Sequence, residues 1–407
     1  MLKHKIILAV TAASVLAIPA IARESRLLDK GWTFSLTPDS GSVVHPFTKT
    51  VDLPHDWSIE LPFDGKASSH NEGGFVIRGK GKYEKEIKLT AKDLADSKYS
   101  LLFEGVYERW TLKVNGKEVG FRPYGYSSVI YDITPYLHAG VNTIEVDVDG
   151  SHGRSGRWYT GSGIYRHVRL IKTGEIAVAP WSLFISTKEI TPSKAVINYS
   201  YDVEGSKNAQ DFEVDLKIID PSGSVVVSSE KQMSGIDMSV RGAMEIPDPK
   251  LWSPDSPSLY TMSLTLRHDG KIMDNVSEKF GIRTISYSAE EGFKLNGEPI
   301  LLNGACVHHD NGMLGAASFD AAEARKVRLM KEAGFNAIRT SHNPPSPGFL
   351  DECDRQGILV IDEAFDGWRD QKNADDYHLW IDEWGVKDVG DMVRRDRNHP
   401  SIIAWSI

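Results

Sequence analysis

Residues 336–363 read NAIRTSHNPPSPGFLDECDRQGILVIDE, and this stretch decides the fold of the last part of the chain. The pattern predicts a strand at Ala337–Arg339, a helix from about Pro347 to Gly357, and a fully apolar strand at Ile358–Ile361. The second strand ends in Asp362-Glu363, and polar residues also follow the first strand. Strands and helices that alternate in this way, with polar residues at the carboxyl ends of the strands, predict the parallel sheet of a (β/α)8 TIM barrel.

The same alternation continues on both sides of this stretch. Upstream, we expect a helix that Asp320 caps, with Glu323 placed to complete a capping box and Gly334 ending the helix. Downstream, the apolar residues Ile402–Trp405 predict a further buried strand. A complete barrel takes about 250 residues. Residues 287–407 are therefore expected to form only its first part, cut at about the fourth strand.

The residues before the barrel segment alternate as strands do and show no long helical period. In 23–174, apolar residues alternate on both sides of the turn Asn115-Gly116, which is typical of a hairpin, and many such strands predict a jelly-roll β-sandwich. In 175–286, Phe212–Ile218 alternates before a turn rich in Pro and Gly, and the length suits an immunoglobulin-like β-sandwich. The chain is thus expected to have several domains.

Charge and the N-terminus limit the classes of function. The 407-residue chain has a formal net charge of −9, which disfavours a nucleic-acid partner because phosphate binding requires clustered Lys and Arg. Residues 1–22 are predicted to be a signal peptide, with a basic start and an apolar stretch too short to span a bilayer. We expect an exported protein, periplasmic or secreted, with no membrane segment after cleavage. Cys306 and Cys353 are expected to be buried free thiols rather than a disulfide.

Arg339, His342 and Asn343 place a cation, an imidazole and an amide just past one strand end. Together they could clamp several hydroxyl groups of one sugar ring, with Arg339 also orienting a neighbouring carboxylate. A structural network that holds the top of the barrel together would use the same residue types. The residues alone do not decide between these two interpretations.

Three further groups follow predicted strands or lie on a Gly-rich loop. Only one member of Asp362-Glu363 can face the barrel axis, and we favour a supporting role for the pair, with Arg339 or Arg394 as partner, over direct catalysis. His308 follows the first barrel strand, where it could contact a substrate hydroxyl or be a satisfied, partly buried histidine. The loop that carries Arg157-Trp158 could reach the site of a neighbouring domain or serve inter-domain packing.

Taken together, these segments resemble the family 2 glycoside hydrolases over essentially the whole chain after residue 22. The stretch from Asn336 through Arg339, His342 and Pro344 to Ile361 resembles the first signature of that family, although Asn343 stands where the family often has Tyr. The stretch Asp396–Ser406 resembles the start of the second signature. Further motifs that look like those of the family are Leu53–Trp57, Arg122–Tyr126, Arg157–Arg166, Asp248–Tyr260 and Asp362–Trp368.

The resemblance implies retaining hydrolysis of a terminal β-linked sugar, most of all β-D-galactose, from a β-galactoside or related oligosaccharide. Neither catalytic carboxylate maps onto this sequence, because the acid/base would follow Ile407 and the nucleophile would lie well beyond it. The 407-residue chain alone is therefore expected to be inactive. By motif position, His308 resembles a histidine that contacts the transition state, His342 a sugar-hydroxyl ligand and Arg339 the arginine near the nucleophile. Arg157-Trp158 resembles the first-domain loop that reaches the site.

Several alternatives remain open at the level of the sequence. The same family includes β-mannosidases and β-glucuronidases, and the chain could also be a non-catalytic glycan-binding protein or one half of a partner assembly. No cofactor or metal is expected: Mg²⁺ occurs in the family, but Gly367 and Arg369 occupy the places of its Glu-x-His ligand pair. A homo-oligomeric state of a full-length form is left open.

Overall fold

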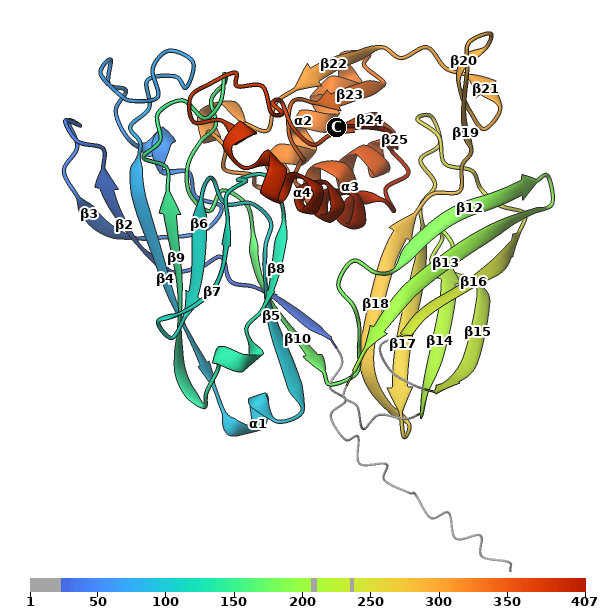
Figure 1. The fold of residues 1–407 in the computed structure, drawn as a ribbon. Coiled ribbons are helices and arrows are strands. Elements are labelled where there is room, and N and C mark those ends of the chain that lie inside the picture. Colours follow the sequence, from blue (N-terminus) through green and yellow to red (C-terminus); the bar gives the residue numbers. More distant parts are fainter. Residues whose placement is uncertain (1–22, 206–210, 235–237) are drawn as a thin grey trace, which may run out of the picture.

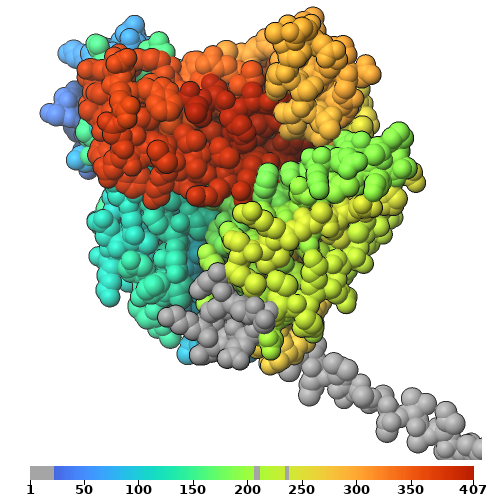
Figure 2. Space-filling view, turned by 45° about the vertical axis from the view of Figure 1, so that its right-hand side comes forward, coloured from blue at the N-terminus to red at the C-terminus, as the bar shows by residue number. Residues whose placement is uncertain are grey.

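The computed structural model describes residues 23–205, 211–234 and 238–407, and the predicted signal peptide at 1–22 lies outside these ranges. Two β-sandwiches are followed by an α/β segment, as predicted. Figure 1 shows the sandwiches side by side, with the α/β segment, coloured orange to red, across one end of both. In Figure 2 the red surface packs directly on both sandwiches. None of the described helices is long and apolar enough to cross a membrane.

The first domain is a sandwich of two antiparallel sheets, with strand orders β3-β2-β4-β9-β6-β7 and β1-β10-β5-β8. Its strands are β1 (Glu24–Leu27), β2 (Trp32–Pro38), β3 (Phe47–Val51), β4 (Gly79–Leu89), β5 (Ser97–Phe103), β6 (Trp110–Val114), β7 (Lys117–Arg122), β8 (Val129–Asp132), β9 (Gly140–Asp149) and β10 (Val168–Gly174), and the short helix α1 is Ala91–Leu94. Alternate side chains of β6 are buried, so one face of each strand joins the core between the sheets. Asn115 and Gly116 both have positive φ in the β6–β7 turn, as the hairpin prediction requires.

The second domain is also a sandwich, with β11, β12 and β16 around β13 facing a sheet of order β15-β14-β17-β18. Its strands are β11 (Ala177–Val178), β12 (Phe184–Thr191), β13 (Lys194–Glu204), β14 (Asp211–Ile219), β15 (Val225–Ser234), β16 (Met238–Pro247), β17 (Tyr260–His268) and β18 (Lys271–Phe280). A small hairpin sheet of β19 (Ile285–Ser288), β20 (Gly292–Leu295) and β21 (Glu298–Pro299) then leads into the barrel segment. The alternation of apolar residues along β14 places Phe212, Val214, Leu216 and Ile218 in the core of this domain.

The last segment is a parallel four-stranded sheet of order β22-β23-β24-β25, connected by helices. Its elements are β22 (Gly304–Val307), α2 (Asp320–Glu332), β23 (Ala337–Thr340), α3 (Pro347–Gln356), β24 (Leu359–Glu363), α4 (Ile381–Asp396) and β25 (Ile402–Ser406). Gly357 ends α3 in the left-handed conformation, as its position in the sequence predicts. The prediction of the first four strands of a TIM barrel is confirmed. All four strands deliver their carboxyl ends to the same edge of the sheet.

Two local predictions were wrong. Asp320 does not cap α2 but is its first residue, and Glu323 accepts hydrogen bonds from Ser318 Oγ at 2.7 Å and Asn311 Nδ2 at 3.0 Å instead of closing a capping box. Both cysteines are free thiols, but only Cys353 is buried. Cys306 is exposed because its strand, β22, is an edge strand of the described sheet.

Buried polar contacts fix the first domain against the barrel segment. Arg122, which is fully buried at the end of β7, donates from Nε to Asp388 Oδ1 at 2.8 Å and pairs with Asp391 at 2.5 Å, both on α4. The Tyr124 hydroxyl donates to the Ala364 carbonyl at 2.6 Å, directly after β24. The loops of the first domain are thereby held at the carboxyl edge of the parallel sheet.

Candidate active site

Glu363, the last residue of β24, organises the cluster at the carboxyl edge of the sheet. Its buried carboxylate accepts from Arg339 Nη2 at 2.8 Å and also from Arg339 Nε, so the guanidinium binds it at both oxygens. The same carboxylate lies 2.9 Å from His342 Nδ1. Arg339 Nη2 also approaches His342 Nδ1, but at the longer distance of 3.4 Å; because a carboxylate only accepts, we assign the proton to Nδ1, which leaves Nε2 for another partner. The hydrogen bond and the charge of Glu363 also raise the pKa of Arg339.

Three rings meet beside this ion pair. The ring centroids of Trp158 and His308 are 5.3 Å apart, those of Trp158 and His342 are 5.5 Å apart, and those of the two histidines are 5.4 Å apart. Burial, followed by the neighbouring His342, lowers the pKa of His308, so its imidazole is neutral at neutral pH. An apolar indole face with two imidazoles suits a ligand that has both C–H faces and hydroxyl groups.

The loop between β9 and β10 carries Trp158 from the first domain into this cluster. Trp158 Nε1 donates to the Tyr126 hydroxyl at 3.1 Å, and Arg157 binds the Asp366 carboxylate of the barrel segment at 2.7 Å. The Asp366 carboxylate is also paired with Lys372 at 3.1 Å. The structure thus places the first-domain loop beside the cluster and packs it against the barrel segment, a position that is compatible with both alternatives that the sequence left open.

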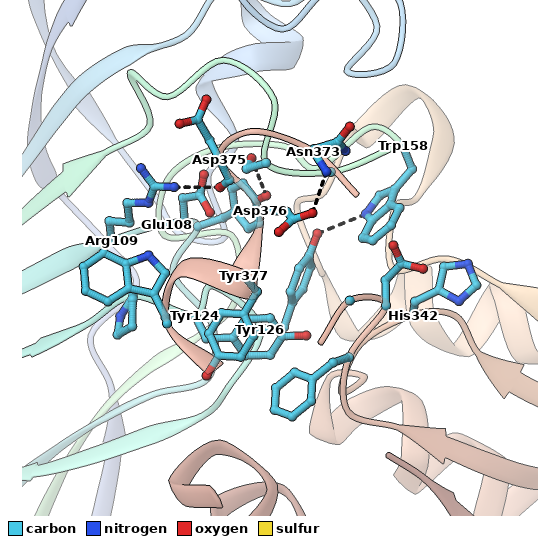
Figure 3. A pocket seen from close by; sticks show the side chains of 18 residues that line it. Glu108, Arg109, Tyr124, Tyr126, Trp158, His342, Asn373, Asp375, Asp376 and Tyr377 are labelled. Atoms are coloured by element: carbon cyan, nitrogen blue, oxygen red, sulfur yellow. Dashed lines mark hydrogen bonds between the residues drawn. The ribbon is translucent and has the colours of Figure 1, made fainter. Parts of the chain in front are cut away.

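A pocket adjoins the cluster, between the first domain and the segment that joins β24 to α4 (Figure 3). The residues labelled in Figure 3 that line it are Glu108, Arg109, Tyr124, Tyr126, Trp158, His342, Asn373, Asp375, Asp376 and Tyr377. Arg109 donates to the Asp375 carbonyl at 2.7 Å and so joins the two walls. Burial raises the pKa of Glu108, and one of its carboxyl oxygens has no partner among the described residues. The walls are therefore aromatic and acidic.

Two predicted site residues do not join the Glu363 cluster. Asp362 points to the opposite side of β24, where burial and then the charge of Asp396 raise its pKa. Asn343 is buried and lines a second, small cavity together with His308. Arg394 was considered as a partner of the acidic pair, but it is exposed and faces Asp391 at 3.5 Å. The predicted residues that meet at the site are His308, Arg339, His342, Glu363, Arg157 and Trp158.

Tyr126 and Asp366 belong to the site, although no role was predicted for them from the sequence. Both lie in stretches that were noted only for their resemblance to family motifs. The alternation of Tyr124-Gly125-Tyr126 gives a signal for buried aromatic residues, but it does not indicate which domain they contact. Asp366 gives no signal of its own, because an acidic residue three positions after a strand is typical of any loop.

One cluster has the residue types of a metal site. Asp351, Asp354 and His399 place a ligand atom each within 4.8 Å of one another. However, His399 Nδ1 lies 2.6 Å from Asp354 Oδ2, and the Ser401 amide donates to Asp354 Oδ1 at 3.0 Å. Burial lowers the pKa of His399, but the charge and hydrogen bond of Asp354 raise it to about 9. A protonated imidazole does not ligate a cation, so we interpret this cluster as a structural ion pair.

Arg369, which stands in the place of a metal ligand of the resembling family, pairs with Asp382 on the surface.

The sequence matches family models over most of its length. Residues 26–174 match the model described as glycosyl hydrolases family 2, sugar binding domain, residues 181–283 match glycosyl hydrolases family 2, and residues 288–407 match glycosyl hydrolases family 2, TIM barrel domain.

Relatives and solved structures agree with these matches. The chain is 41% identical to the β-galactosidase BoGH2A of Bacteroides ovatus over 88% of this chain and 43% of that protein. It is 28% identical to a β-glucuronidase of Bacteroides fragilis over 95% of this chain and 56% of that protein. The crystal structure of a glycosyl hydrolase family 2 member from Bacteroides cellulosilyticus superposes with a TM-score of 0.88 at 39% identity, covering 94% of this chain and 51% of that one. The chain thus spans about half the length of these relatives.

Proposed function

The chain belongs to the glycosyl hydrolases family 2, and from this premise we propose that it forms the sugar-positioning part of an exported β-glycosidase that releases terminal β-D-galactose with retention of configuration. The observation that carries the proposal is the arrangement of Trp158, His308 and His342 beside the Arg339–Glu363 pair. In this proposal the indole packs against a C–H face of the sugar, while His342 Nε2 and His308 bind its hydroxyl groups. Glu363 holds Arg339 and His342 in place and does not react.

The described cluster supports binding of the sugar rather than its hydrolysis. A retaining glycosidase requires two carboxyl groups about 5–5.5 Å apart, one as nucleophile and one as acid/base. Both oxygens of Glu363 are occupied by Arg339 and His342, and Asp366 is paired with Arg157 and Lys372. We therefore propose that the 407-residue chain binds a β-galactoside and does not turn it over. The two reacting carboxylates would come from residues outside this cluster.

The charge of the adjoining pocket supports a neutral sugar over a uronic acid. Glu108, Asp366, Asp375 and Asp376 line it, and Arg109 already donates to a backbone carbonyl there. Burial raises the pKa of Glu108, and Asp366 is paired with Arg157 and Lys372, so the repulsion of a glucuronide carboxylate would come from Asp375 and Asp376. For this reason we place β-galactosides before β-glucuronides.

Binding and turnover of a small glycoside panel test the proposal. We expect phenyl β-D-thiogalactoside to bind the chain in calorimetric titrations, and phenyl β-D-thioglucuronide and phenyl β-D-thiomannoside to bind more weakly. His342→Ala should abolish binding, whereas His268→Ala, at the end of β17 in the second domain, should not change it. Tighter binding of the glucuronide would contradict the choice of galactose, and the absence of binding to any of the three would contradict a sugar site. Release of nitrophenol from nitrophenyl β-D-galactoside by the chain itself would contradict the division between binding and turnover.

A further inference from the structure

Asp56 is a buried carboxylate that joins three separate segments of the molecule. It lies between β3 and β4 and is 2% exposed. One oxygen, Oδ1, accepts from the amides of Ser58 at 3.0 Å and Ser162 at 2.9 Å. The other, Oδ2, accepts from the Tyr159 hydroxyl at 2.5 Å and from the Ala316 amide at 2.8 Å. Burial raises the pKa of Asp56, whereas each of the four donors favours its ionised form.

Two of these donors belong to the loop that carries Trp158, and one belongs to the barrel segment. Tyr159 and Ser162 lie one and four residues after Trp158, and Ala316 lies between β22 and α2. A second bond joins the same two segments: His309 Nε2 lies 3.0 Å from the Thr160 carbonyl oxygen, so the imidazole donates there. This junction therefore holds the loop that carries Trp158 to the barrel segment, in addition to the Tyr126 hydrogen bond and the Arg157–Asp366 pair.

The backbone packs closely around the Asp56 carboxylate on both sides. A Cβ atom at Gly161 would lie 2.8 Å from Asp56 Oδ2 and 2.3 Å from the Ala316 Cβ. A Cβ atom at Gly315 would lie 2.5 Å from the same oxygen. Both glycines have positive φ, at 69° and 60° respectively. The two loops thus approach the carboxylate more closely than other residues would allow, which is the packing expected where a position must be held accurately.

We propose that Asp56 is a positioning residue for sugar binding, which fixes the Trp158 face of the site by tying the first-domain loop to the barrel loop at Ala316. The proposal rests on the proposed function, because it assumes that Trp158 contacts the sugar. Asp56 itself does not touch the ligand. It acts through the placement of Trp158, and this distinguishes it from the residues already assigned to the cluster.

Asp56→Asn is a selective test, because only one of its two orientations keeps most of the bonds. With the amide nitrogen in the place of Oδ2, Tyr159 can turn and accept from it, and only the Ala316 amide loses its acceptor. With the nitrogen in the place of Oδ1, two backbone amides, those of Ser58 and Ser162, face a donor. The first orientation is therefore favoured, and the substitution releases mainly the link to the barrel.

A double-mutant cycle separates positioning from a general structural role. We expect Asp56→Asn to weaken binding of phenyl β-D-thiogalactoside by roughly tenfold, which corresponds to one lost hydrogen bond to a charged group. In a Trp158→Ala background the same substitution should have no further effect, because the ring through which Asp56 acts is gone. The matched control is Asp274→Asn, a fully buried acid that accepts from Arg23 and from the Val178 amide in the second domain and should leave affinity unchanged. Additive effects in the cycle would overturn the proposal.

Amide hydrogen exchange keeps this inference separate from the proposed function. In the free chain, Asp56→Asn should speed exchange at Ala316 and across residues 158–162, and Asp274→Asn should not. If the wild-type chain binds no thiogalactoside but the exchange result holds, then the proposed function fails while the junction at Asp56 stands. Unchanged exchange in both segments of the Asp56→Asn chain would overturn the positioning role, whatever the binding result.

Discussion

Glu363 shows how much of the candidate site depends on one side chain. It is buried, and it is the common partner of Arg339, on the neighbouring strand β23, and of His342, in the loop after that strand. Without this carboxylate, the guanidinium and the imidazole would have no common acceptor. Their positions would then be set by rotamer preference alone, and the free Nε2 of His342 would no longer point in one direction.

We therefore expect Glu363→Gln to abolish thiogalactoside binding while the fold survives. The amide keeps the shape of the side chain but loses the charge and can accept at only one oxygen. Because Arg339 is partly exposed, we expect a loss of only about 1–2 kcal/mol in the free energy of unfolding, measured by urea denaturation. Glu352→Gln, which removes a surface partner of Arg355, is the control and should cost less than about 0.5 kcal/mol. Full affinity in Glu363→Gln would show that Glu363 does not position the Arg339 and His342 side chains for sugar binding.

The sequence predicted that only one member of Asp362-Glu363 would face the site, but it could not predict which one. Alternation along a strand fixes the period of two and leaves the phase to packing. The phase is set here by α4, whose Arg395 and Asp396 form a pair at 2.6 Å on the side that Asp362 faces. The residues next to the strand in the sequence do not indicate this contact, because Arg395 and Asp396 lie on a helix further along the chain.

The ion pair between His399 and Asp354 should give the chain a stability that depends on pH. Burial lowers the pKa of His399, but Asp354, with smaller contributions from Asp396 and Asp351, raises it from about 6.5 in the unfolded chain to about 9 in the folded one. Its contribution is therefore fully present below about pH 6.5 and is lost as the pH rises through about 9, to a total of roughly 3 kcal/mol. Urea denaturation at pH 6 and pH 9.5 measures it. In His399→Asn the difference between the two pH values should shrink, and an unchanged difference would assign it to other groups.

At the scale of elements, the strands and helices of the barrel segment were predictable and their ends were less so. Apolar runs such as Leu359–Ile361 and the stop at Gly357 are local signals, and the structure confirms both. The start of α2 depends instead on tertiary contacts, since Glu323 is held by Ser318 and Asn311 and is not available to the helix end. Local cap rules fail where a side chain finds a better partner outside the helix.

The Trp158 loop is the element whose geometry the sequence could not supply, and two glycines test it. Gly161 and Gly116 both have positive φ, but only Gly161 has neighbours that a Cβ atom would meet. We expect Gly116→Ala to cost about 1 kcal/mol from backbone strain alone, and Gly161→Ala to cost about 3 kcal/mol, because overpacking is added. Urea denaturation measures both values. Equal losses in the free energy of unfolding for the two substitutions would mean that the loops around Asp56 adjust to the added methyl group. In that case Gly161→Ala should also leave thiogalactoside affinity unchanged.

At the scale of the whole molecule, the site exists only because the first domain and the barrel segment are fixed to each other. Trp158 and Arg157 come from the first domain, whereas His308, His342 and Glu363 come from the barrel segment. The chain positions that meet at the site are up to about two hundred residues apart, as Arg157 and Asp366 are. Periodicity, which is local, could predict each domain but not this meeting of two domains.

Arg122 contributes to this inter-domain contact from a fully buried position, where it binds two carboxylates of α4. Arg122→Met would leave Asp388 and Asp391 without the Arg122 cation. Removing one partner of a buried ion pair lowers the free energy of unfolding by about 3–5 kcal/mol. We expect calorimetry to show a lower midpoint and a van't Hoff enthalpy smaller than the calorimetric one, since the two domains would no longer unfold as one unit.

Arg328→Met removes a surface pair with Glu332 on α2 and should leave both quantities unchanged, so it is the matched control. If Arg122→Met melted as the wild-type chain does, the contact with α4 would not couple the domains. The junction at Asp56 and the contacts of Tyr124 and Arg157 with the barrel segment would then have to hold the site together. If instead the transition splits and thiogalactoside binding falls with it, the first domain acts as a structural part of the sugar site. In that case, loss of the inter-domain contact and loss of affinity should occur over the same range of urea concentration.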